Sequence, residues 1–289
     1  MWLLFACASA LFAGLTAVLA KQGVRTTDST LATALRTPVV LVGAWAMTLL
    51  SGSIRALGQV DARSLAYLVL SGLATGASWL CYFKALQLGD VSRVAPVDKM
   101  STVLTVIMAV LLLGEGLSAL GAVGLALVTL GTLLMLRAED LRSLPRALAG
   151  GGGWLLYALG AALFAALTAI LGKIGIAAVP SDLGTAIRTG IVLVMAWVMV
   201  GVVGRLGSAT RVPRGEMIWI LLSGAATCAS WLCYFRALQD GPASVVVPID
   251  KLSVLVSVAF SVLVLREHVG VRALLGLAVL VVGTVALAL

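Results

Sequence analysis

The sequence predicts an all-helical membrane protein whose ten transmembrane helices form two inverted five-helix repeats. Three observations support this fold class. The chain has 289 residues, of which 61% are hydrophobic and only 11% are charged, whereas about a quarter of the residues in a soluble domain are charged. Ten apolar runs are long enough to cross a bilayer. The second half of the sequence also repeats the first half.

The ten apolar runs follow one another so closely that no soluble domain fits between them. They cover residues 2–20, 31–50, 65–88, 91–113, 117–136, 154–171, 183–203, 217–238, 243–265 and 269–289. No basic segment precedes the first run, so we interpret it as a retained helix and not as a signal peptide. The fourth and ninth runs begin near Pro96 and Pro248, and proline is tolerated in the first turn of a helix.

The fifth and tenth runs carry several glycines, including Gly121, Gly124, Gly276 and Gly283. Small residues let membrane helices approach closely. We expect these two helices to act as scaffold or as an interface between protomers, so the sequence leaves both a monomer and a homodimer open.

The internal repeat has an offset of 152 residues and aligns 16–131 with the second half without a gap. Between 71–101 and 223–253, 21 of 31 positions are identical. We therefore divide the chain into a first repeat (1–137), a linker (138–153) and a second repeat (154–289). Because each repeat has an odd number of spans, the second enters the membrane from the opposite side. Inverted repeats are typical of alternating-access transporters, whose binding site lies between the repeats near the bilayer midplane.

The loop charges support this inversion. Eleven Lys and Arg residues fall at one side of the predicted membrane and three at the other. Positively charged loops favour the cytoplasmic side. By this rule both termini lie outside the cytoplasm.

Ionisable residues inside the predicted spans are the first candidates for a binding site. Such residues are costly in a bilayer and usually face a cavity or pair with each other. They are Arg36, Lys84, Asp98 and Lys99, repeated as Arg188, Arg236, Asp250 and Lys251. Six cations against two carboxylates leave a positive surplus, which a packing role alone does not require.

The segment APVDKMS at 95–101, repeated as VPIDKLS at 247–253, places polar side chains on one helical face. Asp98 shares this face with Ser101, and Asp250 shares it with Ser253. The lysine that follows each aspartate points about 100° away. We therefore expect the aspartates to find cations on another helix, with Lys84 and Arg236 as the nearest candidates in the sequence.

The hexapeptide SWLCYF occurs at 78–83 and again at 230–235. Each copy is followed directly by a cation and, three residues after the cation, by a glutamine. It supplies the aromatic and polar candidates Trp79, Tyr82, Gln87, Trp231, Tyr234 and Gln239. Aromatic residues near the end of a span commonly form an interfacial belt. The alternative is that they line a binding cavity for a solute with an apolar body and a polar or anionic head.

Other functions find no support in the sequence. It contains no phosphate-binding loop, no nucleophile–base pair and no metal-ligand spacing, so we expect no enzyme activity, no cofactor and no ATP-driven pump. All four cysteines lie in apolar runs, where they read as small packing residues. The net charge of +8 is scattered through short loops, which does not indicate a nucleic-acid partner.

The two halves, with LFAGLTAVLAK, SWLCYFKALQ, APVDKMS and LLLGE in the first, resemble the EamA family of the drug/metabolite transporter superfamily over essentially the whole chain. The resemblance implies a ten-helix inverted-repeat bundle with a central cavity, and it implies cytoplasmic termini, opposite to the loop charges. The lining residues implied by the resemblance are Thr16, Tyr82, Lys84, Asp98 and Ser101, with Thr168, Tyr234, Arg236, Asp250 and Ser253.

Together these observations predict a secondary transporter of the bacterial cytoplasmic membrane that exports or exchanges a small polar or amphipathic metabolite. The cationic cavity is expected to attract a carboxylate or phosphate, and Asp98 or Asp250 to take up a proton that couples transport. Two alternatives are a flippase for an anionic lipid-linked intermediate and a membrane scaffold that transports nothing.

Overall fold

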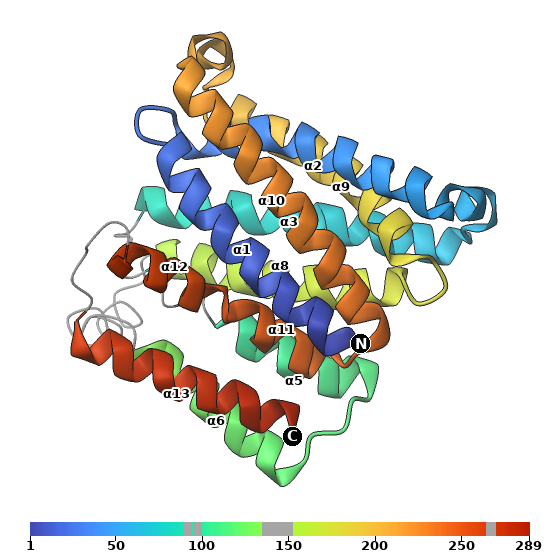
Figure 1. Ribbon diagram of the computed structural model, residues 1–289, viewed down its shortest axis with the longest axis vertical. Coiled ribbons are helices and arrows are strands. Elements are labelled where there is room, and N and C mark those ends of the chain that lie inside the picture. The colour runs from blue at the N-terminus through green and yellow to red at the C-terminus, as the bar shows by residue number, and fades with distance from the viewer. Residues whose placement is uncertain (89–93, 95–96, 98–99, 135–152, 264–269) are drawn as a thin grey trace.

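The computed structural model describes residues 1–88, 94, 97, 100–134, 153–263 and 270–289. Throughout these residues the chain forms helices joined by short connections (Figure 1). Among the described residues, seven helical segments are long and apolar enough to cross a membrane, one of them Ala243–Phe260, which contains a one-residue turn, and three shorter apolar helices occupy the remaining predicted runs. Large apolar side chains, such as Leu4, Leu111 and Leu156, are exposed on the outer faces, as expected of surfaces that face lipid. The all-helical membrane fold is confirmed.

In the first half, helix ends coincide with capping residues. The elements are α1 (Trp2–Gly23), α2 (Ser29–Ser51), the 3-10 helix η1 (Ser53–Gln59), α3 (Ala62–Leu88), α5 (Ser101–Leu113) and α6 (Ala119–Leu134). Asp28 accepts hydrogen bonds from the backbone at the start of α2, and Asp61 does the same for α3. Gly52 and Gly114 end α2 and α5 at φ of +76° and +67°, where only glycine is unstrained.

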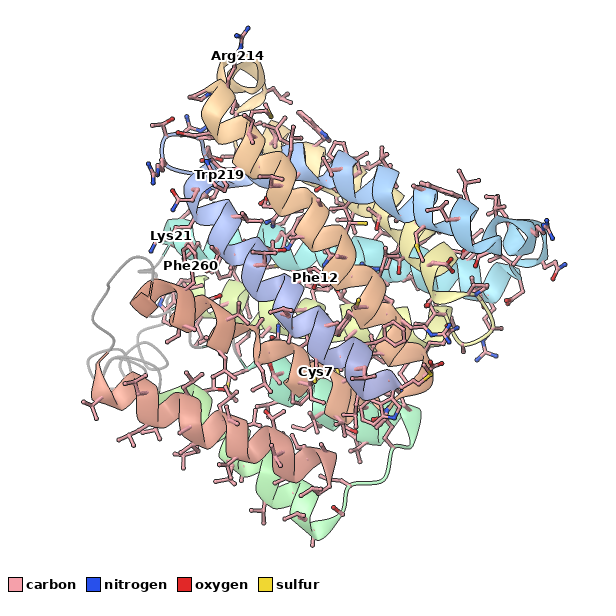
Figure 2. All side chains as sticks on the ribbon, in the orientation of Figure 1. Cys7, Phe12, Lys21, Arg214, Trp219 and Phe260 are labelled. Carbon is pink, nitrogen blue, oxygen red and sulfur yellow. The ribbon has the colours of Figure 1, made fainter. Side chains whose placement is uncertain are left out.

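The second half repeats this order. Its elements are α8 (Gly153–Gly175), α9 (Ser181–Val202), the 3-10 helix η2 (Leu206–Arg211), α10 (Arg214–Asp240), α11 (Ala243–Lys251), α12 (Ser253–Leu263) and α13 (Val271–Ala288). Cys7, Phe12 and Lys21 follow one another along α1. Lys21 lies at the same end of the bundle as Arg214, the first residue of α10 (Figure 2).

The ninth predicted run is broken in the structure, which corrects the expectation of one continuous helix. Pro248 lies inside α11 and has no N–H with which to continue the backbone ladder. A tight turn follows, in which Leu252 N donates to Ile249 O at 2.9 Å, and α12 starts at Ser253. The break matters for the site because it separates Asp250 from the serines beyond it.

Helix contacts obey a pseudo-two-fold relation between the halves. The packing of α3 on α8 recurs as α10 on α1, and that of α3 on α9 recurs as α10 on α2. Individual hydrogen bonds also recur at the offset of 152 residues. Ser78 Oγ donates to Ala161 O at 2.9 Å, and Ser230 Oγ donates to Ser9 O at 3.1 Å. The structure is thus built from inverted repeats.

The glycines of the fifth and tenth runs join α6 to α13 within the chain. A Cβ at Gly124 would lie 2.8 Å from Gly283 O, and one at Gly131 would lie 2.7 Å from Gly276 O. The two backbones touch here, which leaves no space for side chains. We call these four residues the glycine seam. These four glycines are thus used in a contact within the protomer.

Candidate functional site

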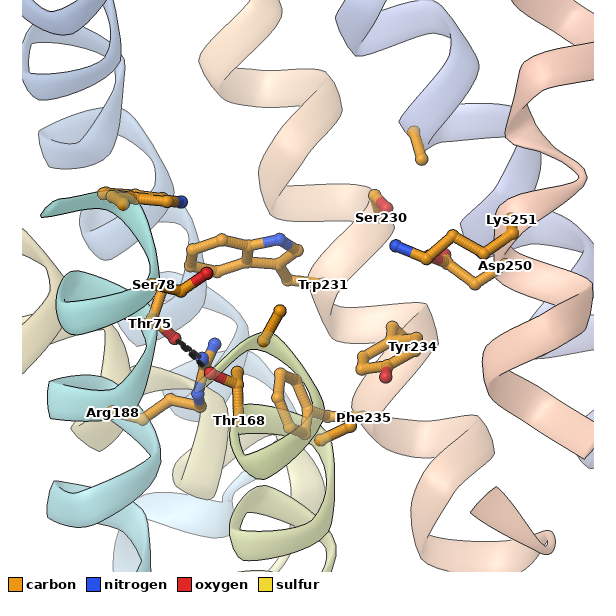
Figure 3. A pocket seen from close by; sticks show the side chains of 14 residues that line it. Thr75, Ser78, Thr168, Arg188, Ser230, Trp231, Tyr234, Phe235, Asp250 and Lys251 are labelled. Carbon is orange, nitrogen blue, oxygen red and sulfur yellow. Dashed lines mark hydrogen bonds between the residues drawn. The ribbon is translucent and has the colours of Figure 1, made fainter. Parts of the chain in front are cut away.

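A cavity of about 300 Å³ lies between the two halves. Helices α1 and α3 of the first half and α8, α9, α10 and α11 of the second half contribute lining residues (Figure 3). Three of these residues carry formal charges, the cations Arg188 and Lys251 and the carboxylate Asp250. A polar cavity at a repeat interface is the arrangement that inverted-repeat transporters use for their solutes.

Arg188 is the most deeply buried charged side chain that the structure describes, with 2% of its surface exposed. Its Nη2 donates to Thr75 Oγ1 at 2.8 Å, and its Nε makes a long contact of 3.4 Å with Ser71 Oγ. Both hydroxyls belong to α3, so they join the α9 arginine to the other half of the protein. The guanidinium also lies over two aromatic rings, 5.0 Å from the centroid of Trp231 and 4.5 Å from that of Phe235.

Asp250 and Lys251 lie at the end of α11, across the α10 rings from Arg188 (Figure 3). Ser9 Oγ donates to Asp250 Oδ1 at 2.6 Å, which connects α11 to α1. Tyr234 lies between the two groups in this view (Figure 3). The cavity therefore has a guanidinium on one wall and a carboxylate with its neighbouring ammonium on the other.

The second copy of the repeated hexapeptide contributes most of the aromatic wall. Trp231, Tyr234 and Phe235 line the cavity, as does Trp79 from the first copy. Tyr82 instead packs against a different apolar cluster that includes Ala85. The alternative that the aromatic residues line a cavity thus fits the second copy of the hexapeptide. In the first copy it fits Trp79 but not Tyr82.

The cations that follow the hexapeptides do not lie in the cavity. Lys84 is exposed and contacts Gln87, with Nζ 3.4 Å from Oε1. Arg236 forms a half-exposed ion pair with Asp240 at 3.1 Å. The predicted pairing of Arg236 with Asp250 is therefore wrong. Successive helical residues are about 100° apart, so Arg236, two positions beyond the cavity-lining Tyr234, points to the opposite face.

Two other predicted residues, Thr16 and Gln239, form hydrogen bonds in the framework around the cavity, and a third, Arg36, lies at a separate cavity. Thr16 donates to Phe12 O at 2.9 Å and accepts a 3.4 Å contact from Thr227. Gln239 donates to two backbone carbonyls, Ile176 O at 2.7 Å and Val179 O at 2.8 Å, and so holds the connection after α8. Arg36 borders a separate cavity of about 390 Å³ beside the end of α1.

A further cavity of about 420 Å³ is lined by polar residues that follow the α11 break. Ser253 and Ser257 of α12 line it together with Thr102 of α5. Lys251 lines both this cavity and the central one. Ser101 is buried, whereas Asp98 and Lys99 lie outside the described residues. Thr168 is the one member of its predicted pair with Thr16 that lines the central cavity.

Sequence reasoning did not find Ser9, Ser71 and Thr75, which hold the charged groups in place. Ser71 and Thr75 lie inside the strongly repeated segment, as Ser223 and Thr227 do in the second half. Their recurrence beside glycines on one helical face was the available signal. Ser9 had none, because its counterpart in the second half is Ala161.

A second ionic arrangement lies at the start of α11, where Gly241 packs against Trp2. Glu115 accepts hydrogen bonds from Ala243 N at 2.7 Å and Ser244 N at 2.8 Å, at the start of α11, and forms a 3.1 Å ion pair with Lys173. Lys173 also donates to Gly241 O. Burial alone would raise the pKa of Glu115, but the hydrogen bonds from Ser244 and Ala243 and the charge of Lys173 outweigh it, and the pKa lies below its usual value. We call this group the Glu115 clamp.

The fold and the cavity describe a polytopic helical membrane protein with a charged space between two related halves. The sequence model of the EamA-like transporter family matches residues 1–137 and 152–289. The chain belongs to this family, and it is therefore a membrane transporter and not an enzyme.

One relative by sequence and one solved structure also match the chain. An uncharacterized transporter in the cobO 3' region of Sinorhizobium sp is 47% identical over 134 residues, which make up 46% of this chain and 95% of the relative. One solved crystal structure aligns with 100% of this chain and 98% of its own at a TM-score of 0.73 and 18% identity, a likeness that concerns the fold alone. The resemblance seen in the sequence is confirmed.

Proposed function

We propose that the protein is a secondary active transporter of the bacterial cytoplasmic membrane that exports or exchanges a small polar or amphipathic metabolite by alternating access. The observation that carries this proposal is the charged cavity of about 300 Å³ whose walls come from both repeats. Binding pockets for small molecules combine apolar walls with a few placed polar groups, and this cavity has four aromatic residues and three ionisable ones.

Asp250 supports a coupling role within the proposal. Its carboxylate contacts the neutral hydroxyl of Ser9 and lies beside Lys251, in a space large enough for water. A carboxylate that can exchange a proton with such a space can couple solute movement to a proton gradient. Asp98 occupies the equivalent position in the first repeat of the sequence.

The experiment first identifies the solute and then blocks the cavity. Metabolites released by overexpressing cells are compared with those released by deletion cells, and the enriched compound is measured for flux into proteoliposomes. Ala165→Trp fills the cavity from α8, so flux should fall to that of empty vesicles. Leu159→Trp is the matched control, because Leu159 is 48% exposed on the outside of the same helix.

Several outcomes would count against the proposal. Full flux in A165W would remove the cavity from the pathway. Should A165W not fold, Ala13→Trp fills the same cavity from α1 and serves the same purpose. In the same vesicles, Asp250→Asn should make flux independent of an imposed pH gradient. A D250N variant that keeps its response would remove the coupling role of this residue but not the carrier function.

A further inference from the structure

Arg188 is held in place by groups that leave its charge uncompensated. Its hydrogen-bond acceptors are the neutral hydroxyls of Thr75 and Ser71. Among the described residues, no carboxylate lies within 4 Å of the guanidinium. Burying a cation without a counter-ion costs free energy. The Arg188 side chain is 2% exposed and lines a cavity, so an anion bound in that cavity would offset this cost.

The charges of the cavity indicate the charge of such a ligand. Its described ionisable lining consists of two cations, Arg188 and Lys251, and one carboxylate, Asp250, which leaves one positive charge in excess (2 − 1 = 1). While Asp250 is ionised, a monoanion balances this lining, whereas a doubly charged phosphate monoester exceeds it.

The surroundings of Arg188 favour a carboxylate on an apolar body. The planar guanidinium matches the two oxygens of a carboxylate. The rings of Trp231 and Phe235 lie against the same guanidinium and continue into the cavity wall, where an apolar ligand body can pack.

The equivalent arginine shows that this arrangement is not imposed by the repeat. Arg36 has counterparts of every Arg188 partner in the sequence, including Ser223 and Thr227. Yet in the part of the chain that the structure describes, no aromatic ring stacks on Arg36 and it donates no hydrogen bond to either hydroxyl. The caged guanidinium therefore belongs to the central cavity and not to the repeat as such.

We propose that the cavity binds a small organic monocarboxylate, with the carboxylate on Arg188 and the apolar body against Trp231 and Phe235. This inference rests on the proposed function, because it takes the cavity to be the site of the transported solute.

The test compares two probes of the same shape, benzoate and uncharged benzamide. The purified full-length chain in micelles is titrated with each probe, and binding is followed by the fluorescence of the cavity tryptophans. Benzoate should bind more tightly than benzamide. Arg188→Gln should weaken benzoate by about ten- to a hundredfold, the usual effect of losing a hydrogen-bonded charge, and leave benzamide unchanged. Arg188→Lys keeps the charge but loses the planar fork, so its affinity should be intermediate.

The matched control is Arg63→Gln, since Arg63 also lies over an aromatic ring, Tyr67 at 5.9 Å, but is exposed at the start of α3. R63Q should bind both probes as the unmodified protein does. If R188Q does not fold, R188K decides the matter alone. Equal binding of the two probes, or equal binding of benzoate by R188K and the unmodified protein, would overturn the proposal. A different result would count against the proposed function alone: benzoate binds through Arg188, but A165W leaves flux intact.

Discussion

At the scale of single residues, identical side chains in the two halves have unequal surroundings. Thr75 and Thr227 occupy equivalent positions, and each donates to the carbonyl one turn earlier. Each also contacts a threonine of the other half, Thr168 at 3.3 Å and Thr16 at 3.4 Å. Only Thr75 accepts a hydrogen bond from a buried guanidinium. The same sequence thus serves packing in one half and the orientation of a charge in the other.

This difference gives a paired prediction. Thr75→Val and Thr227→Val remove the same hydroxyl, but only the first leaves Arg188 without its 2.8 Å acceptor. Thr75→Val should lower the free energy of unfolding by about 1 kcal/mol more than Thr227→Val, the difference between a charged and a neutral hydrogen bond. Unfolding in micelles, followed by circular dichroism, provides the measurement. Equal losses would show that Arg188 draws no stability from Thr75.

At the scale of elements, the Glu115 clamp fixes the start of α11, the helix that carries Asp250 and Lys251. A carboxylate at a helix N-terminus satisfies backbone N–H groups that have no partner in the helix. Here the carboxylate comes from the connection between α5 and α6 in the first half, and Lys173 comes from the second. The clamp therefore ties the position of the site helix to the packing of both repeats.

The lowered pKa of Glu115 makes the contribution of the clamp depend on pH. A carboxyl whose pKa is lower in the folded state stabilises that state above its unfolded value, about 4.3, and loses this effect as pH falls through the folded value. Glu115→Gln should cost about 1.5–3 kcal/mol at pH 7 and progressively less in acid. Thermal unfolding in micelles over a pH series measures this.

The control for the clamp is Asp240→Asn, which breaks the exposed pair with Arg236. Exposed pairs contribute about 0–1 kcal/mol, so this variant should change little at any pH. A constant gap between E115Q and the unmodified protein from neutral to acid pH would contradict the assignment.

The elements also mark the limit of what the sequence could predict. Runs of apolar residues and the offset of 152 residues are local or periodic signals, and from them the helices and the inversion followed. Placing Lys84 and Arg236 required knowing which face of α3 and α10 meets the other half. The prediction inferred that both cations are buried because their neighbours in the sequence are apolar. In the structure each cation instead has a partner on the outward face of its own helix, Gln87 for Lys84 and Asp240 for Arg236. The Glu115 clamp joins residues 128 positions apart, and no local pattern indicates such a contact.

At the scale of the whole molecule, the glycine seam joins the last helices of both repeats backbone to backbone. A Cβ at Gly131 would lie 2.5 Å from Leu280 N, and backbone atoms cannot move aside as the end of a side chain can. Gly190 in α9 has the same helical setting but open space around it, with nothing within 4 Å.

The two glycines should respond to alanine with opposite signs. Gly131→Ala should destabilise the protein by about 1–3 kcal/mol, the usual cost of an overpacked contact. Gly190→Ala should stabilise it by about 0.5–1 kcal/mol, because alanine loses less backbone freedom in a helix. Unfolding free energies of the purified variants measure both effects. A stabilised G131A would mean that α6 and α13 separate without cost.

The helix break after Pro248 places one long, mobile side chain where two spaces meet, since Lys251 borders both the central cavity and the one beyond α12. The two spaces are therefore not electrically independent. A negative charge placed in either one is attracted by the same ammonium, whose flexible four-carbon stem can bend toward it.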